Sequence, residues 1–197
     1  MSPSLATFTP ALGPQPANAH FYSAHTTTLH MKEKVFSITG DDFTIKTVDG
    51  TEVCKCKGKV ISLKDKKKFV GTDGKEIFTL GNKMLSIHKS FHAESPTGHD
   101  FEVHGHWKMI GSRSTVTFKN AADGNAVELE ILGSWMDRSA EIKWGGRQVA
   151  HISRSFFNVR EMFGDKQTYF VTVAPNVDLS MIAAICVSLD ERENEDK

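Results

Sequence analysis

The sequence predicts a mainly β protein in which a closed antiparallel barrel of ten to twelve strands encloses one hydrophobic helix. The first observation is an 11-residue run, Leu179 to Leu189, that is apolar except for Ser180 and Ser188. It is too short to cross a bilayer and apolar on every side, so other parts of the protein must surround it. The second is that the preceding chain consists of short alternating strands. A barrel would enclose the helix and leave no strand edge exposed.

Four turn dipeptides predict four hairpins along the chain, because Asp-Gly and Gly-Gly supply the positive φ angles of tight turns. The dipeptides are Asp49-Gly50, Asp73-Gly74, Asp123-Gly124 and Gly145-Gly146, between predicted strands 43–48 and 51–56, 68–70 and 76–80, 115–118 and 127–131, and 140–144 and 148–152. Further strands are expected at 35–38, 59–63 and 167–173. Asp178 is the expected N-cap of the helix. A helix that follows a series of hairpins excludes a doubly wound sheet.

The chain is expected to form one domain with two tails. Residues 1–31 contain four of the six prolines and no charged side chain, which predicts a disordered or loosely attached N-terminal tail. The predicted barrel domain spans residues 32–191, and residues 192–197 form an acidic C-terminal tail.

The composition indicates which partners and which cellular compartment to expect. Lys plus Arg equals Asp plus Glu, 24 each, so nucleic acid is not expected as a partner. Cys54, Cys56 and Cys186 fit neither a disulfide framework nor a CxxC pair, which favours free thiols in a reducing compartment. No secretory signal or membrane-spanning segment is predicted. The expectation is an intracellular, cytoplasmic protein that is not transmembrane, with peripheral attachment to a membrane as the alternative.

Two segments and the order of elements resemble the LURP-one-related family, which shares the tubby-like fold with phospholipid scramblases. The segments are GNKMLSIHKSFH (81–92) and NVDLSMIAAICVSLDE (176–191), the second following a final strand. The resemblance covers about residues 32–191. It implies a twelve-stranded barrel around a central hydrophobic helix, and no established enzymatic activity. Tubby relatives bind phosphoinositide headgroups, so a lipid ligand is a hypothesis. The chain lacks the cysteine cluster and the EF-hand-like acidic loop of the scramblases.

The first candidate site is a lysine-rich stretch that would bind anionic phospholipid headgroups. Its residues are Lys55, Lys57, Lys59, Lys66, Lys67 and Lys68. In a strand the first three share one face, opposite Cys54 and Cys56, and the others are expected at a turn beside them. Lysines near an anionic leaflet contribute about 1 kcal/mol each. The alternative is a solvated outer face whose lysines prevent edge pairing.

The second candidate is a group of histidines, since five of the nine lie between positions 88 and 106. His104 and His106 share one side of a strand, which is how a metal site in a β-barrel enzyme begins. No carboxylate follows them at the required spacing, and no complete zinc-like ligand set is present, so surface histidines are the favoured interpretation. No cofactor is predicted. Without a GxSxG elbow or a phosphate loop, the chain is not expected to be an enzyme. A protein-interaction scaffold is a third hypothesis.

The helix is expected to fill the lumen of the barrel. The residues predicted to be buried there are Leu179, Ile182, Ala183, Ile185, Cys186 and Leu189. Trp107, Trp135 and Trp144 are expected to pack the helix against the wall rather than to line a ligand cavity. A binding site is therefore expected on the outer surface or at a rim.

Overall fold

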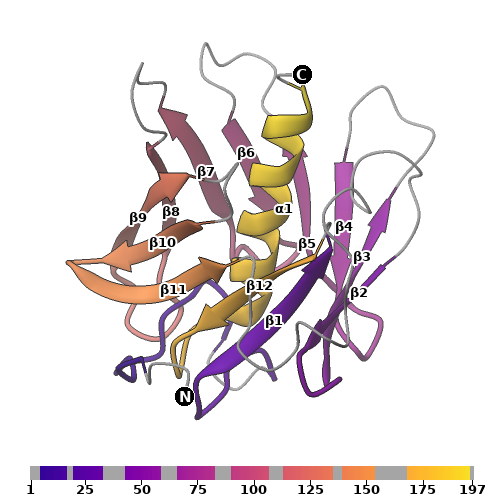
Figure 1. The fold of residues 1–197 in the computed structure, drawn as a ribbon. Coiled ribbons are helices and arrows are strands. Elements are labelled where there is room, and N and C mark those ends of the chain that lie inside the picture. The colour runs from indigo at the N-terminus through magenta and orange to yellow at the C-terminus, as the bar shows by residue number, and fades with distance from the viewer. Residues whose placement is uncertain are drawn as a thin grey trace.

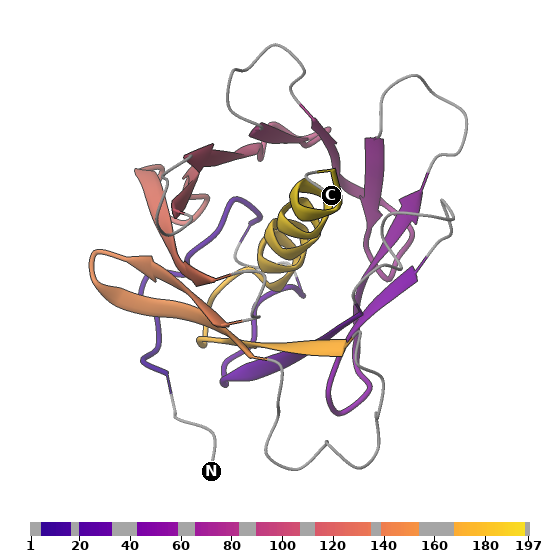
Figure 2. The same ribbon diagram turned by 45° about the horizontal axis from the view of Figure 1, so that its top comes forward.

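In the computed structural model, residues 5–16, 20–32, 43–58, 66–82, 90–106, 113–134, 139–153 and 168–195 are described. Twelve antiparallel strands of this part of the chain close into one barrel, and one helix runs through it (Figures 1 and 2). The strands are β1 (Thr27–Lys32), β2 (Phe43–Thr47), β3 (Glu52–Gly58), β4 (Lys66–Val70), β5 (Glu76–Asn82), β6 (Ser90–Glu94), β7 (Phe101–His106), β8 (Arg113–Lys119), β9 (Ala126–Ser134), β10 (Ser139–Trp144), β11 (Arg147–Ser153) and β12 (Thr168–Val173), and the helix is α1 (Leu179–Glu195).

The strands follow chain order around the barrel, and the barrel closes where the first strand meets the last. β1 pairs with β12 over its full length, with Leu29 opposite Val171, and with β2 on its other side. This closure confirms the predicted fold class. It also leaves no free strand edge in the described sheet.

The four predicted hairpins are confirmed as β2–β3, β4–β5, β8–β9 and β10–β11. Their turn glycines adopt the left-handed backbone conformation that an L side chain disfavours. These are Gly50, Gly74, Gly124, Gly145 and Gly146, with φ between 55° and 89°. The strand predicted at 167–173 is present as β12, whereas those predicted at 35–38 and 59–63 lie outside the described residues.

The N-terminal region differs from the loosely attached tail expected for residues 1–31. Residues 27–32 form β1, and upstream of them Leu5, Phe8 and Leu12 are buried. The segment has no periodicity because it is irregular, yet isolated apolar side chains along it enter the core one by one. Composition and periodicity do not reveal burial of that kind.

The helix occupies the lumen (Figure 2), and every residue from Asp178 to Asp190 is buried. Asp178 caps it as predicted: its Oδ1 accepts hydrogen bonds from the backbone N–H groups of Ser180 (2.9 Å) and Met181 (3.2 Å). The helix continues past Leu189 to Glu195, because no Gly or Pro interrupts the charged residues that follow. The predicted core residues Leu179, Ile182, Ala183, Ile185, Cys186 and Leu189 are all buried.

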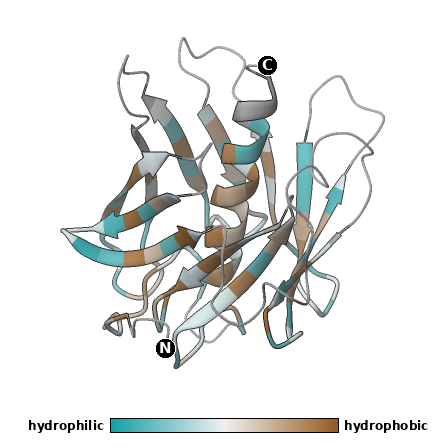
Figure 3. Ribbon diagram, in the orientation of Figure 1, coloured by the Kyte–Doolittle hydropathy of each residue, from teal (hydrophilic) through white to brown (hydrophobic). Residues whose placement is uncertain are grey.

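Cysteine and aromatic side chains complete the core around the helix. Cys54, Cys56 and Cys186 are free and buried, and burial raises the pKa of the Cys54 thiol well above its usual range. Trp144 packs on Phe8 of the N-terminal region, with ring centroids 6.2 Å apart, a contact that the sequence did not predict. Trp107 and Trp135 lie outside the described residues. In Figure 3 the middle of α1 is coloured hydrophobic, whereas part of β4 is hydrophilic.

Candidate functional site

The predicted lysine cluster lies on the neighbouring antiparallel strands β3 and β4, and their alternation decides where each side chain points. Cys54, Cys56 and Phe69 are fully buried and face the helix. Side chains at the intervening positions therefore face outward. The outward lysines are Lys55, Lys57, Lys66 and Lys68, which we call the lysine face.

The strand register brings like charges together on this face. Lys57 lies directly opposite Lys68 across the β3–β4 pair, and Lys66 is two residues from Lys68 on the same side of β4. Like charges in directly opposite positions destabilise a sheet. The strands are nevertheless paired here, so the barrel tolerates a concentrated positive charge at this point of its surface.

Two carboxylates partly neutralise the lysine face. The Nζ of Lys55 lies 3.4 Å from Oε1 of Glu52, and the Nζ of Lys68 lies 2.5 Å from Oε2 of Glu76. Lys66 extends over Gly81 of β5, where a Cβ atom would stand 3.4 Å from the lysine Cγ. Among the residues that the structure describes, no carboxylate forms an ion pair with Lys57 or Lys66.

Lys67 does not belong to the lysine face, which corrects the grouping of all six lysines. It sits between two outward residues of β4, so its side chain points into the barrel. There its Nζ lies 2.7 Å from Oε1 of Glu191 near the end of α1, and each side chain is only 13% exposed. Residues 66 and 67, expected at a turn, extend the strand that was predicted from position 68. Lys59 lies outside the described residues.

The adjoining strand β2 contributes a lysine that the sequence analysis missed. Lys46 is exposed and lies opposite Glu52 in the register of β2 with β3. It stands alone in the sequence, outside the dense run. Only its position in an outward-facing part of the neighbouring strand could have identified it.

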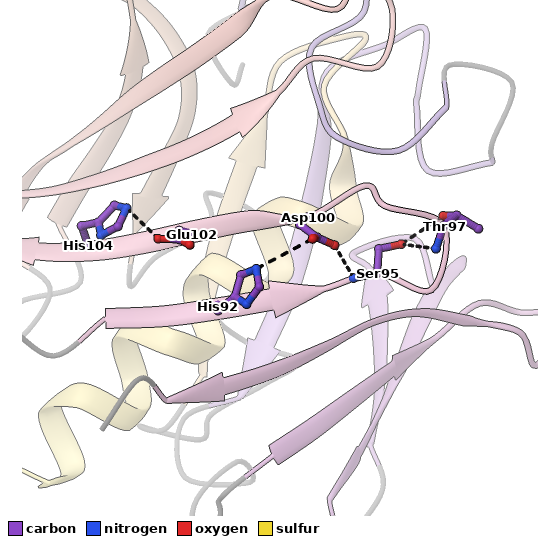
Figure 4. Close-up of polar contacts among 6 residues, drawn as sticks. All are labelled: His92, Ser95, Thr97, Asp100, Glu102 and His104. Atoms are coloured by element: carbon purple, nitrogen blue, oxygen red, sulfur yellow. Dashed lines mark hydrogen bonds and ion pairs between the residues drawn. The ribbon is translucent and has the colours of Figure 1, made fainter. Parts of the chain in front are cut away.

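Of the histidine group, His92 and His104 lie on the outer wall of β6 and β7 (Figure 4). The Nε2 of His92 is 3.9 Å from Oδ2 of Asp100, and the Nε2 of His104 is 3.3 Å from Oε2 of Glu102. Asp100 also accepts a 2.6 Å hydrogen bond from the backbone N–H of Ser95, which ties down the β6–β7 turn. All four of these charged or polar side chains are partly exposed.

These side chains form separate pairs and do not converge on one point. Within the described part of the chain, no group of three or more His, Cys, Asp or Glu side chains could hold a metal ion. The side chain of His106, the second residue of the hypothetical metal site, lies outside what the structure describes, as does His88. The geometry of His104 is that of a surface histidine bonded to Glu102 and Thr117.

No helix in the described ranges is both long and apolar enough to cross a membrane.

Comparison with known proteins finds relatives along nearly the whole chain. The sequence profile of the LURP-one-related family matches residues 27–190. Protein LURP-one-related 15 of Arabidopsis thaliana is 27% identical over 197 residues, covering 96% of this chain and 90% of that protein. Protein LURP1 of the same plant is 27% identical over 173 residues, covering 84% and 83%. None of these names denotes an enzyme.

A solved structure shows the same fold. An X-ray structure of an Arabidopsis thaliana protein superimposes with a TM-score of 0.56 and 19% sequence identity. The superposition covers 92% of this chain and 99% of the other. At this level of identity the likeness concerns the fold.

Proposed function

The chain belongs to the LURP-one-related family, and on this basis we propose that it is a non-catalytic module that docks on anionic phospholipid headgroups, phosphoinositides in particular, through its lysine face. The observation that carries the proposal is the direct opposition of Lys57 and Lys68, with Lys66 beside them. A bound phosphate would remove the repulsion that this register creates.

The shape of the molecule favours the outer wall as the place for a ligand. The helix fills the lumen, where many β-barrels bind small molecules. The lysine face lies on β3 and β4, whose register fixes the spacing of the backbone positions that carry the four lysines. An array of this kind suits a headgroup that carries more than one phosphate, because each phosphate meets its own lysine.

The experiment is a flotation assay with phosphatidylcholine vesicles that contain or lack phosphatidylinositol bisphosphate. The wild-type protein is expected to float only with the phosphoinositide, and less so at high salt, because screening weakens surface electrostatics. Replacing both Lys57 and Lys66 by Gln removes two contributions of about 1 kcal/mol each. The expected loss of affinity is about 30-fold.

Two single variants serve as controls. Lys119→Gln removes an exposed lysine from β8, outside the lysine face, and Lys67→Gln removes the inward lysine of β4. Neither is expected to change flotation. Equal binding by the wild type and the Lys57/Lys66 double variant would refute the proposal, as would equal flotation with and without phosphoinositide.

A further inference from the structure

Glu76 is the first residue of β5, and its carboxylate lies beside the lysine face. Its Oε2 is 2.5 Å from the Nζ of Lys68, and its Oε1 accepts a 2.8 Å hydrogen bond from the Oγ1 of Thr79. Thr79 is directly opposite Lys68 in the register of β4 with β5. One carboxylate therefore holds an ammonium group and a hydroxyl group together at one point of the outer wall.

A β-bulge in the β4–β5 pair accounts for the direction of the Glu76 side chain. Phe69 pairs with Phe78, and the next residue of β4 pairs with Glu76. Ile77 is therefore an extra residue on β5. Strict alternation would turn Glu76 inward together with Phe78, which is fully buried. Bulges are frequent next to active sites, where they re-aim side chains, and this one brings a carboxylate to the outer wall.

Glu76 explains how the barrel accommodates the like charges of the lysine face. Lys57 and Lys68 are directly opposite each other across the β3–β4 pair, an arrangement that destabilises a sheet. Glu76 is on the other side of β4, so its contact draws the ammonium group of Lys68 toward β5 and away from Lys57. The carboxylate is an internal counter-ion at the place where two ammonium groups would otherwise face each other.

A phosphate monoester can replace this carboxylate and make further contacts. It carries a charge of about −1.5 to −2 at pH 7 and has three strong acceptor oxygens. Two of these oxygens can accept the hydrogen bonds that Lys68 and Thr79 now donate to Glu76. The third is available to Lys57, which lies across β4. A headgroup with a single negative charge has no such advantage over the carboxylate.

The ion pair of Glu76 is exposed enough to exchange for a ligand. The side chains of Lys68 and Glu76 are 38% and 27% exposed, whereas those of the inward pair, Lys67 and Glu191, are each 13% exposed. Ion pairs at the surface contribute little net free energy, and side chains at the surface change rotamer within picoseconds to nanoseconds. A more highly charged ligand can therefore displace Glu76 from Lys68 without disturbing the barrel.

We propose that Lys57, Lys68 and Thr79 form a phosphate subsite, and that Glu76 is the internal counter-ion that a phosphate monoester of the lipid headgroup displaces. This inference rests on the proposed function, because the phosphate is that of the phosphoinositide headgroup. It adds a hydroxyl donor to the binding residues. It also makes Glu76 the residue that determines specificity, since only a headgroup with more charge than a carboxylate gains by replacing it.

The first experiment compares Glu76→Ala with the wild type in flotation with phosphatidylcholine vesicles that contain phosphatidylinositol bisphosphate, phosphatidylserine or neither. The variant is expected to bind the phosphoinositide vesicles about fivefold more tightly, which corresponds to the contribution of one lysine near an anionic leaflet. It is also expected to float with phosphatidylserine, whereas the wild type does not. If Glu76→Ala does not fold, Glu76→Gln takes its place, because it keeps the side-chain shape and removes the charge.

Glu52→Ala is the matched control. Glu52 is the first residue of β3, as Glu76 is of β5, and its carboxylate also pairs with a lysine of the lysine face, Lys55, at 3.4 Å. The control removes the same charge outside the proposed subsite and is expected to change the affinity less than about twofold. An equal gain in Glu52→Ala and Glu76→Ala would mean that only the total charge of the wall matters, and the inference would be wrong.

The hydroxyl of Thr79 is tested in the Glu76→Ala background. Adding Thr79→Val removes the donor with little change of shape and is expected to lower the affinity for the phosphoinositide vesicles about fivefold. Thr79→Ser keeps the hydroxyl and is expected to retain the affinity of Glu76→Ala. Equal affinities of the Val and Ser variants would exclude Thr79 from the site and overturn the subsite as proposed.

Soluble inositol trisphosphate separates recognition of the phosphate from attraction to a charged membrane. In isothermal titration calorimetry Glu76→Ala is expected to bind it about fivefold more tightly than the wild type does, because the subsite contacts the phosphate itself. A gain that appears with vesicles but not with the soluble headgroup would show that Glu76 acts only through the surface charge, which contradicts the inference.

The results distinguish this inference from the proposed function. If the wild type floats with phosphoinositide and Glu76→Ala binds it no more tightly, the lysine face binds the headgroup and the inference alone is wrong. If neither protein floats, both are wrong. If only Glu76→Ala floats, the counter-ion closes the subsite in the wild type, which supports the inference while the proposed function fails its own test.

Discussion

Lys66 and Lys67 are neighbours of the same type on one strand, and the structure gives them opposite roles. Lys66 is exposed on the outer wall, whereas Lys67 points into the barrel and pairs with Glu191 of the helix. The chemistry of the two side chains is identical, so their different surroundings come from strand alternation alone. Consecutive lysines in a strand therefore alternate between two roles. The inward ones stabilise the fold, and the outward ones are available to a ligand.

The same contrast holds for the whole barrel. Inward positions meet the helix in a buried interior, where an unpaired polar group costs free energy, whereas outward positions meet water. Substitutions at inward-facing positions should therefore change the stability of the fold, whereas substitutions at outward-facing positions should change binding.

The largest loss of stability is expected from a substitution at the centre of the helix. Ile185 is fully buried, and Ile185→Asp places an unpaired carboxylate in the lumen, which should prevent folding. Loss of the cooperative thermal transition in circular dichroism is the measurement. The matched control, Ile185→Val, should lose only about 1 kcal/mol of unfolding free energy. A soluble, cooperatively folded Ile185→Asp variant would contradict the helix-in-barrel structure.

The second-largest loss of stability is expected from a substitution at the helix N-cap. Asp178→Ala removes the acceptor for the N–H groups of Ser180, Met181 and Gln15, all in a buried setting. The expected loss of unfolding free energy is about 2 to 4 kcal/mol in urea denaturation. Asp178→Asn keeps an acceptor oxygen and should lose less than half of that. Equal losses in the two variants would show that the cap hydrogen bonds are not the cause.

A smaller effect is expected at the inward lysine. Lys67→Ala leaves the carboxylate of Glu191 without this ion pair in a setting that is only 13% exposed. The expected loss is about 1 to 3 kcal/mol. The double variant Lys67→Ala/Glu191→Ala should lose less than the sum of the two single losses, because the two groups interact directly. Strict additivity would mean that the pair contributes nothing.

The smallest effect on stability is expected at the outward lysine. Lys66→Ala lies on the outer wall and should change the unfolding free energy by no more than about 0.5 kcal/mol. A loss as large as that of Lys67→Ala would remove the distinction between the two walls. The pair of variants, measured side by side in urea denaturation, tests the comparison directly.

Much of the fold could be predicted because short sequence patterns specify its turns, its strands and its helix. The dipeptides Asp49-Gly50 and Gly145-Gly146 specify hairpin turns through backbone sterics alone. The uninterrupted apolar stretch after Asp178 requires enclosure whatever encloses it. The inward direction of Cys54 and Cys56 follows from alternation once β3 is recognised.

The burial of residues 5–16 and the members of the lysine face could not be predicted in the same way. Phe8 and Leu12 enter the core from an irregular segment, and no local period marks their burial. Lys46 joins the outer wall from a different hairpin, and Lys67 leaves the predicted cluster for a carboxylate 124 positions away, at Glu191. The surroundings of these four side chains depend on tertiary contacts between segments that are far apart in the sequence.

The sequence by itself determined the class of this protein: hairpins that close into a barrel, and a capped helix too apolar to lie anywhere but inside it. Those features depend on turn sterics, alternation and the hydrophobic effect, which act over a few residues. Only the tertiary structure decided which lysines face water, which one holds the helix, and that the N-terminal region covers the end of the barrel. Those outcomes depend on the register between strands and on contacts between segments far apart in the chain, which no local pattern encodes.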